Sequence, residues 1–170
     1  ALKTAGYTFI RPFEIGLALA ENQDEQLRHL GAIFCRALGV AFQIQDDIVD
    51  AFGTVEETGK TPLSDIRDHQ HSYLTQWVAE HGNAKQLETL HRCWGNSSIS
   101  LEERDEVRRM FVQSGALTSA LAACEDELTR ARAALQKLQP TPSLEALFSA
   151  VIKKAVPEEL LQAIRVRSSV

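Results

Sequence analysis

Cysteine is scarce in this sequence and forms no recognisable framework. Among 170 residues there are three cysteines, Cys35, Cys93 and Cys124, which lie far apart and leave no CxxC pair. An odd, widely spaced set argues against both a disulfide scaffold and a zinc site, so we expect reduced thiols and a cytoplasmic protein. The five histidines form no HExxH or three-histidine group, and we expect His29 and His91 to lie on helix surfaces.

Long apolar runs and an excess of positive charge are also missing. No run approaches the ~20 residues that cross a bilayer, so we expect no transmembrane helix, and we recognise no signal peptide. The net charge of −5 argues against nucleic acid as the main partner, because phosphate backbones bind basic surfaces. A composition with 44% hydrophobic and 24% charged residues is typical of a soluble globular protein, and we expect one helical domain over residues 1–170.

Strand patterning is absent as well, and helix-forming residues dominate. Val, Ile and Thr nowhere alternate with polar residues for long, whereas Ala, Leu, Glu, Gln and Arg are frequent, which predicts an all-α fold. The longest helix is expected at residues 24–52, where apolar residues recur at helical spacing up to Gly53. Residues 54–63 are predicted to be a loop, because they carry Gly59 and Pro62. The other expected helices cover residues 13–20, 64–80, 84–94, 101–112, 116–138, 143–154 and 157–164.

One segment of the long helix, FQIQDDIVD, carries most of the potential chemistry. It places Asp46 and Asp50 on one helix face, with Asp47 beside them. Carboxylates this close repel one another unless a cation lies between them, and Mg²⁺ prefers such oxygen ligands together with substrate phosphates. Gln43 and Gly39 continue the stripe toward the N-terminus, where Gly39 would let a ligand approach the backbone. The alternative is a solvated acidic face that binds no ligand.

Two segments with lysines flank this motif. Lys60 follows Gly59 in a TGK tripeptide, where a glycine hinge could bring its charge over a phosphate, and Ser64 and Asp65 come shortly afterwards in an SDI tripeptide. Near the start, KTAGYTF places Lys3 ahead of two aromatic residues. Taken alone, each lysine could equally be a surface residue, and the first segment could be a frayed terminus.

Together these blocks resemble the C-terminal half of trans-isoprenyl diphosphate synthases, the polyprenyl synthetase family that includes farnesyl and geranylgeranyl diphosphate synthases. KTAGYTF, FQIQDDIVD, TGK and SDI stand in the order of that family and near its spacing. The resemblance covers residues 1–73 by motif and the rest by helical pattern. It implies the all-α isoprenoid synthase bundle, of which this chain would be the C-terminal half.

The resemblance also implies a function, a cofactor and a set of site residues. Such an enzyme is a trans-prenyltransferase that condenses isopentenyl diphosphate with an allylic diphosphate and depends on Mg²⁺. One aspartate would ligate the metal directly, two would ligate it or hold metal-bound water, and two lysines would bind the allylic diphosphate. Asp46 would be the direct ligand, and Asp47 and Asp50 would be the other two aspartates. The lysines would be Lys3 and Lys60, and Thr4 and Gln43 would line the pocket near the allylic carbons.

Two departures from the family pattern bear on activity. The family has another aspartate-rich motif upstream, whereas this sequence contains one, so the chain is expected to be inactive alone and to be a fragment or a split subunit. A homodimer is expected, or a partner chain that supplies the first motif. Gln70 stands where the family has a lysine, and an amide brings no charge, so Arg67, His69 or His71 would have to compensate.

Three alternatives remain open from the sequence. A non-catalytic subunit of a heteromeric synthase would explain Gln70 and the single aspartate-rich motif. A class I terpene cyclase also uses DDxxD, although KTAGYTF, TGK and SDI are typical of the chain-elongating enzymes. The third is a helical interaction protein whose aspartates are only a solvated face.

Overall fold

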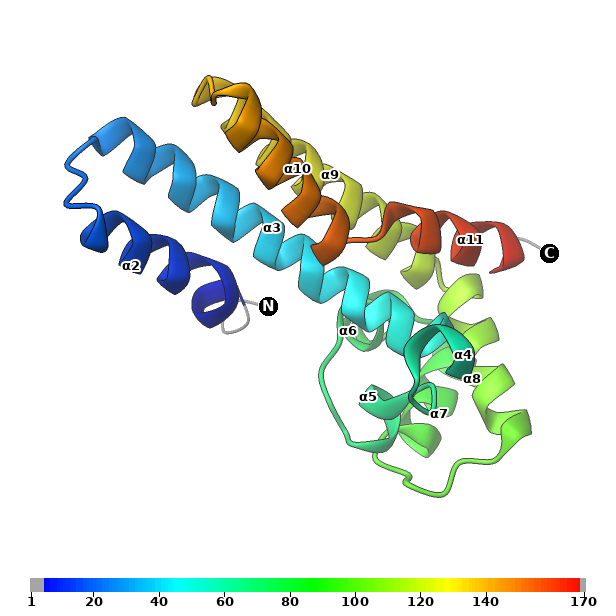
Figure 1. Ribbon diagram of the computed structural model, residues 1–170. Helices are drawn as coiled ribbons and strands as arrows, with labels where there is room; N and C mark the ends of the chain where they lie inside the picture. Colours follow the sequence, from blue (N-terminus) through cyan, green and yellow to red (C-terminus); the bar gives the residue numbers. More distant parts are fainter. Residues whose placement is uncertain (1–4, 169–170) are drawn as a thin grey trace. The chain divides into compact units, whose positions relative to one another are not determined.

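The structure, a computed structural model, describes residues 5–168 as a succession of helices (Figure 1). No strand occurs among these residues, which confirms the predicted all-α fold. The elements in chain order are η1 (Gly6–Ile10, a π-helix), α2 (Arg11–Leu19), α3 (Glu25–Phe52), α4 (Val55–Thr58), α5 (Ser64–Arg67), α6 (Tyr73–His81), α7 (Ala84–Cys93), α8 (Leu101–Gln113), α9 (Ala116–Lys137), α10 (Pro142–Ala155) and α11 (Glu158–Ser168).

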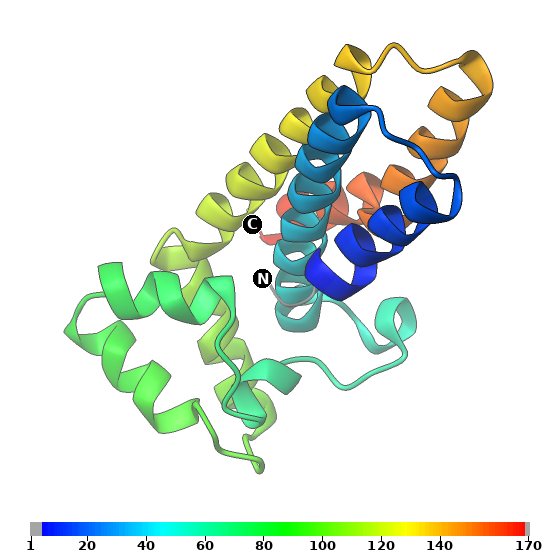
Figure 2. The ribbon, with the colours of Figure 1, turned by 90° about the vertical axis from the view of Figure 1, so that its left-hand side faces the viewer.

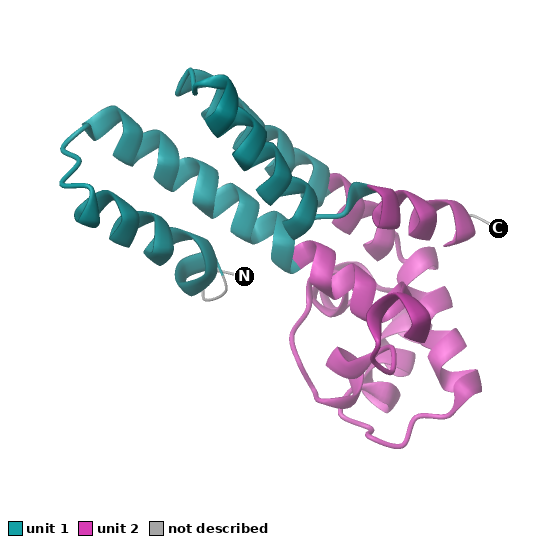
Figure 3. Cartoon of the chain, viewed as in Figure 1, with its two compact units in different colours: residues 1–43, 123–158 teal, residues 44–122, 159–170 magenta. Residues whose placement is uncertain are grey.

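The helices group into two compact units, and α3 and α9 contribute to both (Figure 3). Unit 1 comprises residues 1–43 and 123–158, and unit 2 comprises residues 44–122 and 159–170. The expectation of one domain over residues 1–170 stays a prediction.

Unit 1 is built on the apolar face of the first part of α3. Phe34 and Leu38 are buried there, and the ring of Phe34 meets that of Phe148 on α10 edge to face, with centroids 5.1 Å apart. The Sγ atom of Cys124 on α9 donates to the carbonyl oxygen of Ala41 at 3.5 Å. Helix α2 folds back along α3 in both views (Figures 1 and 2). The predicted helical spacing of apolar residues in α3 is therefore confirmed for this face.

Two glycines of α3 allow close neighbours in unit 1. A Cβ on Gly39 would lie 2.5 Å from the Cβ of Ala5 and 2.6 Å from its Cα. A Cβ on Gly31 would lie 2.0 Å from the ring of Phe13, which belongs to α2. The expected role of Gly39 is thus wrong, because the face that it leaves open is covered by the chain's own buried Ala5 and not by a ligand.

Unit 2 packs α6, α7 and α8 next to one another (Figure 2). The ring of Phe111 on α8 is buried and meets that of Phe52, the last residue of α3, with centroids 6.4 Å apart. Each of the three helices begins with a capping box, led by Ser72, Asn83 and Ser100 respectively. These boxes satisfy backbone N–H groups that have no partner within the helix, and so fix where each helix starts.

The expected helix at residues 64–80 is wrong. Helix α5 ends at Arg67 and α6 begins at Tyr73, with a turn between them. His69 in that turn has a φ of 55°, a left-handed conformation that a right-handed helix cannot contain. The loop expected at residues 54–63 also contains the one-turn helix α4, and the last helix reaches Ser168.

The three cysteines lie in the interior and two of the histidines lie at the surface, while the expected absence of a disulfide and of a zinc site stays a prediction. All three cysteines are free and buried, and His29 and His91 are exposed. Burial raises the pKa of Cys35 to about 11 and the pKa of Cys124 to about 12. Both thiols therefore stay protonated at neutral pH.

Helix α3 is, within residues 5–168, the one helix long and apolar enough to cross a membrane. Of its most apolar stretch, 44% is buried inside the protein, and the core helix of a soluble protein satisfies the same criterion. The expectation that no helix crosses a membrane stays a prediction.

Candidate functional site

A pocket of about 180 Å³ lies in unit 2, lined by the last turns of α3 and the segment that follows. We call it the Asp46 pocket. Asp46 and Asp50 line it together with Lys60, so the structure brings the DDxxD and TGK motifs to one place, as predicted. The other lining residues are Val49, Thr58, Thr61, Pro62, Ser64 and Asp65.

Asp46 lies on the exposed side of α3, and the charges of a lysine and of another aspartate both affect its pKa. Desolvation by the surrounding protein raises its pKa, the charge of Lys60 lowers it, and the charge of Asp50 raises it. The net shift is upward, so the nearby lysine does not fully offset the loss of water around this carboxylate.

Asp65 adds another carboxyl group to the pocket. Burial, followed by repulsion from four neighbouring aspartates, raises its pKa to about 7. A bound cation would relieve this repulsion and favour the ionised form. The four repelling residues are Asp50, Asp47, Asp46 and Asp68.

Asp50 also holds the segment that closes the pocket. Its Oδ1 accepts the backbone N–H of Ser64 at 3.0 Å and the Ser64 hydroxyl, and its Oδ2 accepts the N–H of Asp65 at 3.0 Å. These are the first N–H groups of α5, which have no partner within the helix. One carboxylate of α3 thus fixes the start of α5.

Asp47 lies on another side of α3 and does not line the pocket. It is 6% exposed, and its Oδ2 accepts the N–H of Tyr73, the first residue of α6, at 2.6 Å. In this structure Asp50 and Asp47 therefore bind the starts of α5 and α6, and their predicted roles in metal binding stay predictions.

The carboxylates of the pocket suit a divalent cation that is shared with a phosphate. Within residues 5–168 no group of three His, Cys, Asp or Glu side chains is placed to hold a metal ion. Mg²⁺ usually takes one or two protein carboxylates and completes its shell with water and substrate phosphates. Asp46 and Asp50 offer such oxygen donors, and the pKa of Asp65, raised first by burial and then by neighbouring carboxylates, includes a repulsion that such an ion would relieve.

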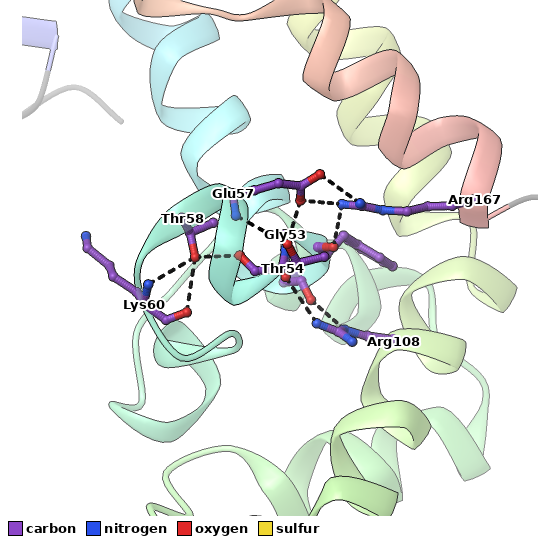
Figure 4. Close-up of polar contacts among 9 residues, drawn as sticks. Gly53, Thr54, Glu57, Thr58, Lys60, Arg108 and Arg167 are labelled. Atoms are coloured by element: carbon purple, nitrogen blue, oxygen red, sulfur yellow. Dashed lines mark hydrogen bonds and ion pairs between the residues drawn. The ribbon is translucent and has the colours of Figure 1, made fainter.

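Lys60 lies in a short turn that is held by hydrogen bonds to α4. Gly59 ends α4 in the left-handed conformation, with a φ of 67°, and its N–H donates to the carbonyl of Val55 at 2.7 Å. The N–H of Lys60 then donates to the Thr58 hydroxyl at 3.1 Å. The expected glycine precedes Lys60, whose side chain is exposed and lines the pocket, and its movement over a phosphate stays a prediction. Figure 4 shows Lys60 and its bonds to Thr58.

Of the remaining predicted site residues, the structure describes only Gln43, which does not line this pocket. Gln43 is half-buried and belongs to unit 1, whereas Lys3 and Thr4 lie outside the described residues. Their predicted contacts with the substrate stay predictions.

The residues around the departure at Gln70 turn away from the pocket. The Gln70 side chain donates to a backbone carbonyl two residues earlier at 3.1 Å. The rings of His69 and His71 pack on Trp94, with centroids 4.4 and 4.8 Å away. Neither they nor Arg67 line the Asp46 pocket, so among residues 5–168 Lys60 is the basic residue that lines it.

Sequence reasoning missed two arginines that bind the end of α3 (Figure 4). The Nε of Arg108 on α8 donates to the carbonyl of Ala51 at 2.8 Å, and Nη2 of Arg167 on α11 donates to that of Phe52 at 2.9 Å. Nothing in the local sequence around α3 signals partners that lie so far along the chain.

Comparison with known proteins places these features in a family. The polyprenyl synthetase family model matches residues 1–112. Farnesyl pyrophosphate synthase of Saccharomyces cerevisiae is 34% identical over 102 residues, which cover 60% of this chain and 29% of that protein. Geranylgeranyl pyrophosphate synthase of Schizosaccharomyces pombe is 30% identical over 95 residues, covering 56% of this chain and 27% of that protein.

The fold is shared with solved structures. Geranylgeranyl pyrophosphate synthase from Corynebacterium glutamicum, complexed with isoprenyl diphosphate and magnesium, superposes with a TM-score of 0.79 at 22% identity, covering 90% of this chain and 43% of that chain. The expected isoprenoid synthase architecture is therefore confirmed, although the chain spans only 29% and 27% of the two curated relatives. On the match over residues 1–112, the chain belongs to the polyprenyl synthetase family.

Proposed function

We propose that this chain forms the diphosphate-binding half of a trans-prenyltransferase of the farnesyl or geranylgeranyl diphosphate synthase type. The enzyme condenses isopentenyl diphosphate with an allylic diphosphate in a Mg²⁺-dependent reaction. The observation that carries the proposal is the Asp46 pocket, where aspartates able to share a cation line the same space as a lysine able to bind phosphate.

The chemistry of the reaction requires this combination. When the allylic C–O bond ionises, negative charge develops on the departing diphosphate, and the double bond of isopentenyl diphosphate attacks the carbocation before a proton is lost. Lys60 would bind phosphate oxygens directly, while Asp46 and Asp50, which line the same pocket, would hold the metal. Bound Mg²⁺ supplies further neutralisation of the developing charge.

The proposal includes a partner for this chain. The upstream aspartate-rich motif comes from a longer form of the chain or from a partner chain, in an assembly that we propose to be dimeric. Support comes from Leu19 on α2 and Leu147 on α10, which are 82% and 58% exposed and leave apolar surface for further protein to cover. We place the protein in the cytoplasm, on the support of its three free thiols.

Calorimetry tests the proposed site. The chain is titrated with a non-hydrolysable allylic diphosphate analogue, with and without Mg²⁺, alongside Asp46→Ala and the exposed control Asp105→Ala on α8. We expect binding that needs Mg²⁺, falls at least about tenfold in Asp46→Ala, as loss of a charged ligand contact implies, and is unchanged in Asp105→Ala.

Co-expression with an upstream half from a family member then separates catalysis from binding alone. Restored condensation supports the prenyltransferase assignment. Mg²⁺-dependent binding without condensation in any assembly would identify a non-catalytic subunit. If neither this chain nor a completed assembly binds the analogue, the acidic stripe is only a solvated face and the proposal is wrong.

A further inference from the structure

The end of α3 is closed by groups from three other parts of unit 2. The carbonyl of Asp50 accepts the N–H of Leu63 at 2.7 Å, and the next carbonyl accepts Nε of Arg108 at 2.8 Å. The carbonyl of Phe52 accepts Nη2 of Arg167 at 2.9 Å. The last carbonyls of a helix have no partner within it and carry partial negative charge, so guanidinium groups are favourable there. The helix that bears the aspartates thus ends against Arg167 of α11 (Figure 4).

Arg167 also binds α4, the one-turn helix that follows. Its Nη1 and Nη2 donate to Oε1 and Oε2 of Glu57, each at 2.9 Å, which is the two-pronged geometry of a strong arginine–carboxylate pair. The hydrogen bonds from Arg167 are the largest contribution that lowers the pKa of Glu57 to about 2, so both groups are charged at neutral pH. One guanidinium therefore joins the end of α3 to α4.

Hydrogen bonds through Thr54 and Thr58 connect Glu57 to the backbone of Lys60. Oε2 of Glu57 accepts the N–H of Thr54 at 2.9 Å, which forms the capping box that starts α4. The Thr58 hydroxyl donates to the carbonyl oxygen of Thr54 at 2.9 Å and accepts the N–H of Lys60 at 3.1 Å. The backbone of Lys60 is thus bonded to α4, as Figure 4 shows.

A helix of this length needs such an attachment. Isolated helices shorter than about 12 residues are marginal in water, and α4 has four residues. Its position therefore depends on bonds to the rest of unit 2, which include the pair between Arg167 and Glu57, charged on both sides. Neither Arg167 nor Glu57 lines the Asp46 pocket.

We propose that Arg167 is a positioning residue that holds Lys60 at the Asp46 pocket through Glu57 and α4. This inference rests on the proposed function of the pocket, because it assigns Lys60 to a bound diphosphate. It makes Arg167 of α11, 107 residues along the chain from Lys60, part of the support of the phosphate-binding group.

A double-mutant cycle tests the proposal, with inorganic pyrophosphate and MgCl₂ as the probe. Affinity is measured by calorimetry for the chain and for Lys60→Ala, Arg167→Ala and the double variant. We expect about a tenfold loss in Lys60→Ala, as removal of one charge-assisted hydrogen bond implies, and a smaller loss in Arg167→Ala. The double variant should bind no more weakly than Lys60→Ala, because Arg167 acts only through that lysine.

Arg132→Ala is the matched control. Arg132 on α9 pairs with Glu158 of α11 and is, like Arg167, a partly exposed arginine in an ion pair with a glutamate of another helix. We expect Arg132→Ala to leave pyrophosphate affinity unchanged. A loss as large as that of Arg167→Ala would mean that any loosening of α11 suffices, which would overturn the specific role of the Glu57 pair.

Amide hydrogen exchange gives a readout that needs no ligand. The N–H groups of Thr54 and Lys60, which bond to Glu57 and Thr58, should exchange severalfold faster in Arg167→Ala and remain unchanged in Arg132→Ala. Arg167→Lys keeps the charge but not the two-pronged geometry, and should be intermediate. If Arg167→Ala does not fold, Glu57→Gln removes the charged pair from the other side and takes its place in the cycle.

The outcomes separate this inference from the proposed function. Additive losses in the double variant, or unchanged exchange at Thr54 and Lys60, overturn the positioning role while the effect of Lys60→Ala still supports the pocket. If Lys60→Ala leaves pyrophosphate affinity unchanged, or if neither the chain nor a completed assembly binds the probe, the assignment of Lys60 fails and the positioning role fails with it.

Discussion

Asp46, Asp47 and Asp50 lie within about one turn of the same helix and meet three different environments. Asp46 lines the pocket beside Lys60, Asp47 is buried against the start of α6, and Asp50 both lines the pocket and fixes the start of α5. Substitution of Asp47 or Asp50 therefore removes a structural hydrogen bond as well as a possible metal ligand. Asp46 is the residue of the motif at which loss of ligand binding can be separated from loss of structure.

Asp65 should make stability depend on pH when no metal is present. Its pKa rises from 3.8 to about 7 on folding, so the folded protein retains a proton that the unfolded chain releases. Its contribution to stability is therefore lost as pH rises between these values. Relative to the unsubstituted chain, Asp65→Asn should raise Tm by a few degrees at pH 8 and leave it unchanged near pH 3.

Thermal melts in buffer with EDTA measure this, with Asp105→Asn as an exposed control on α8. Added Mg²⁺ should reduce the benefit of Asp65→Asn at pH 8, because the cation replaces the proton as the partner of the carboxylates. A Tm difference that is the same at both pH values would show that the asparagine acts through packing and not through charge.

At the scale of helices, local sequence signals located most elements but not the turn between α5 and α6. The long helix was predictable because its apolar residues recur at helical spacing over many turns and end at Gly53. The turn was missed although Ser72 and Thr75 form a local capping box at the start of α6, because Asp50 and Asp47 of α3 also accept the first N–H groups of α5 and α6. Partners that distant in sequence leave no local pattern.

The candidate site shows the same division. The juxtaposition of Asp46, Asp50 and Lys60 was predictable, since DDxxD lies near the end of a helix and TGK follows it directly. The arginines that support the end of α3 were not, because Arg108 and Arg167 reach it through tertiary packing. The covering of Gly39 by Ala5 likewise depends on how η1 and α3 meet.

Two glycine-to-alanine substitutions in helices should have opposite effects on stability. In Gly39→Ala the new Cβ would lie 2.6 Å from the Cα of Ala5, and overpacking against backbone costs about 1–3 kcal/mol, more than the gain of about 1 kcal/mol in helix propensity. In Gly16→Ala nothing lies within 4 Å of the new Cβ, so the gain of roughly 0.5–1 kcal/mol remains.

Urea denaturation followed by circular dichroism measures both free energies of unfolding. Gly39→Ala should unfold at lower urea than the unsubstituted chain, and Gly16→Ala at higher urea. If both variants are stabilised, Ala5 yields to the added methyl group and the contact with Gly39 is not tight.

At the scale of the whole molecule, two long helices run through both units. Both α3 and α9 have residues in unit 1 and in unit 2. A helix that unwinds at one end loses hydrogen bonds cooperatively along its length, so loss of one unit should destabilise the other. The Asp46 pocket lies within unit 2, and its integrity should therefore follow the stability of the entire chain.

The buried cysteines make this coupling observable, because they act as natural probes of opening in each unit. Cys35 and Cys124 lie in unit 1 and Cys93 lies in unit 2, all within 5% exposure. An alkylating reagent reacts with thiolates, so it reaches these sulfurs only when the surrounding helices open. Increasing urea should speed the labelling of all three in parallel, as mass spectrometry of the digested protein would reveal, whereas earlier labelling of Cys93 would mean that unit 2 opens independently.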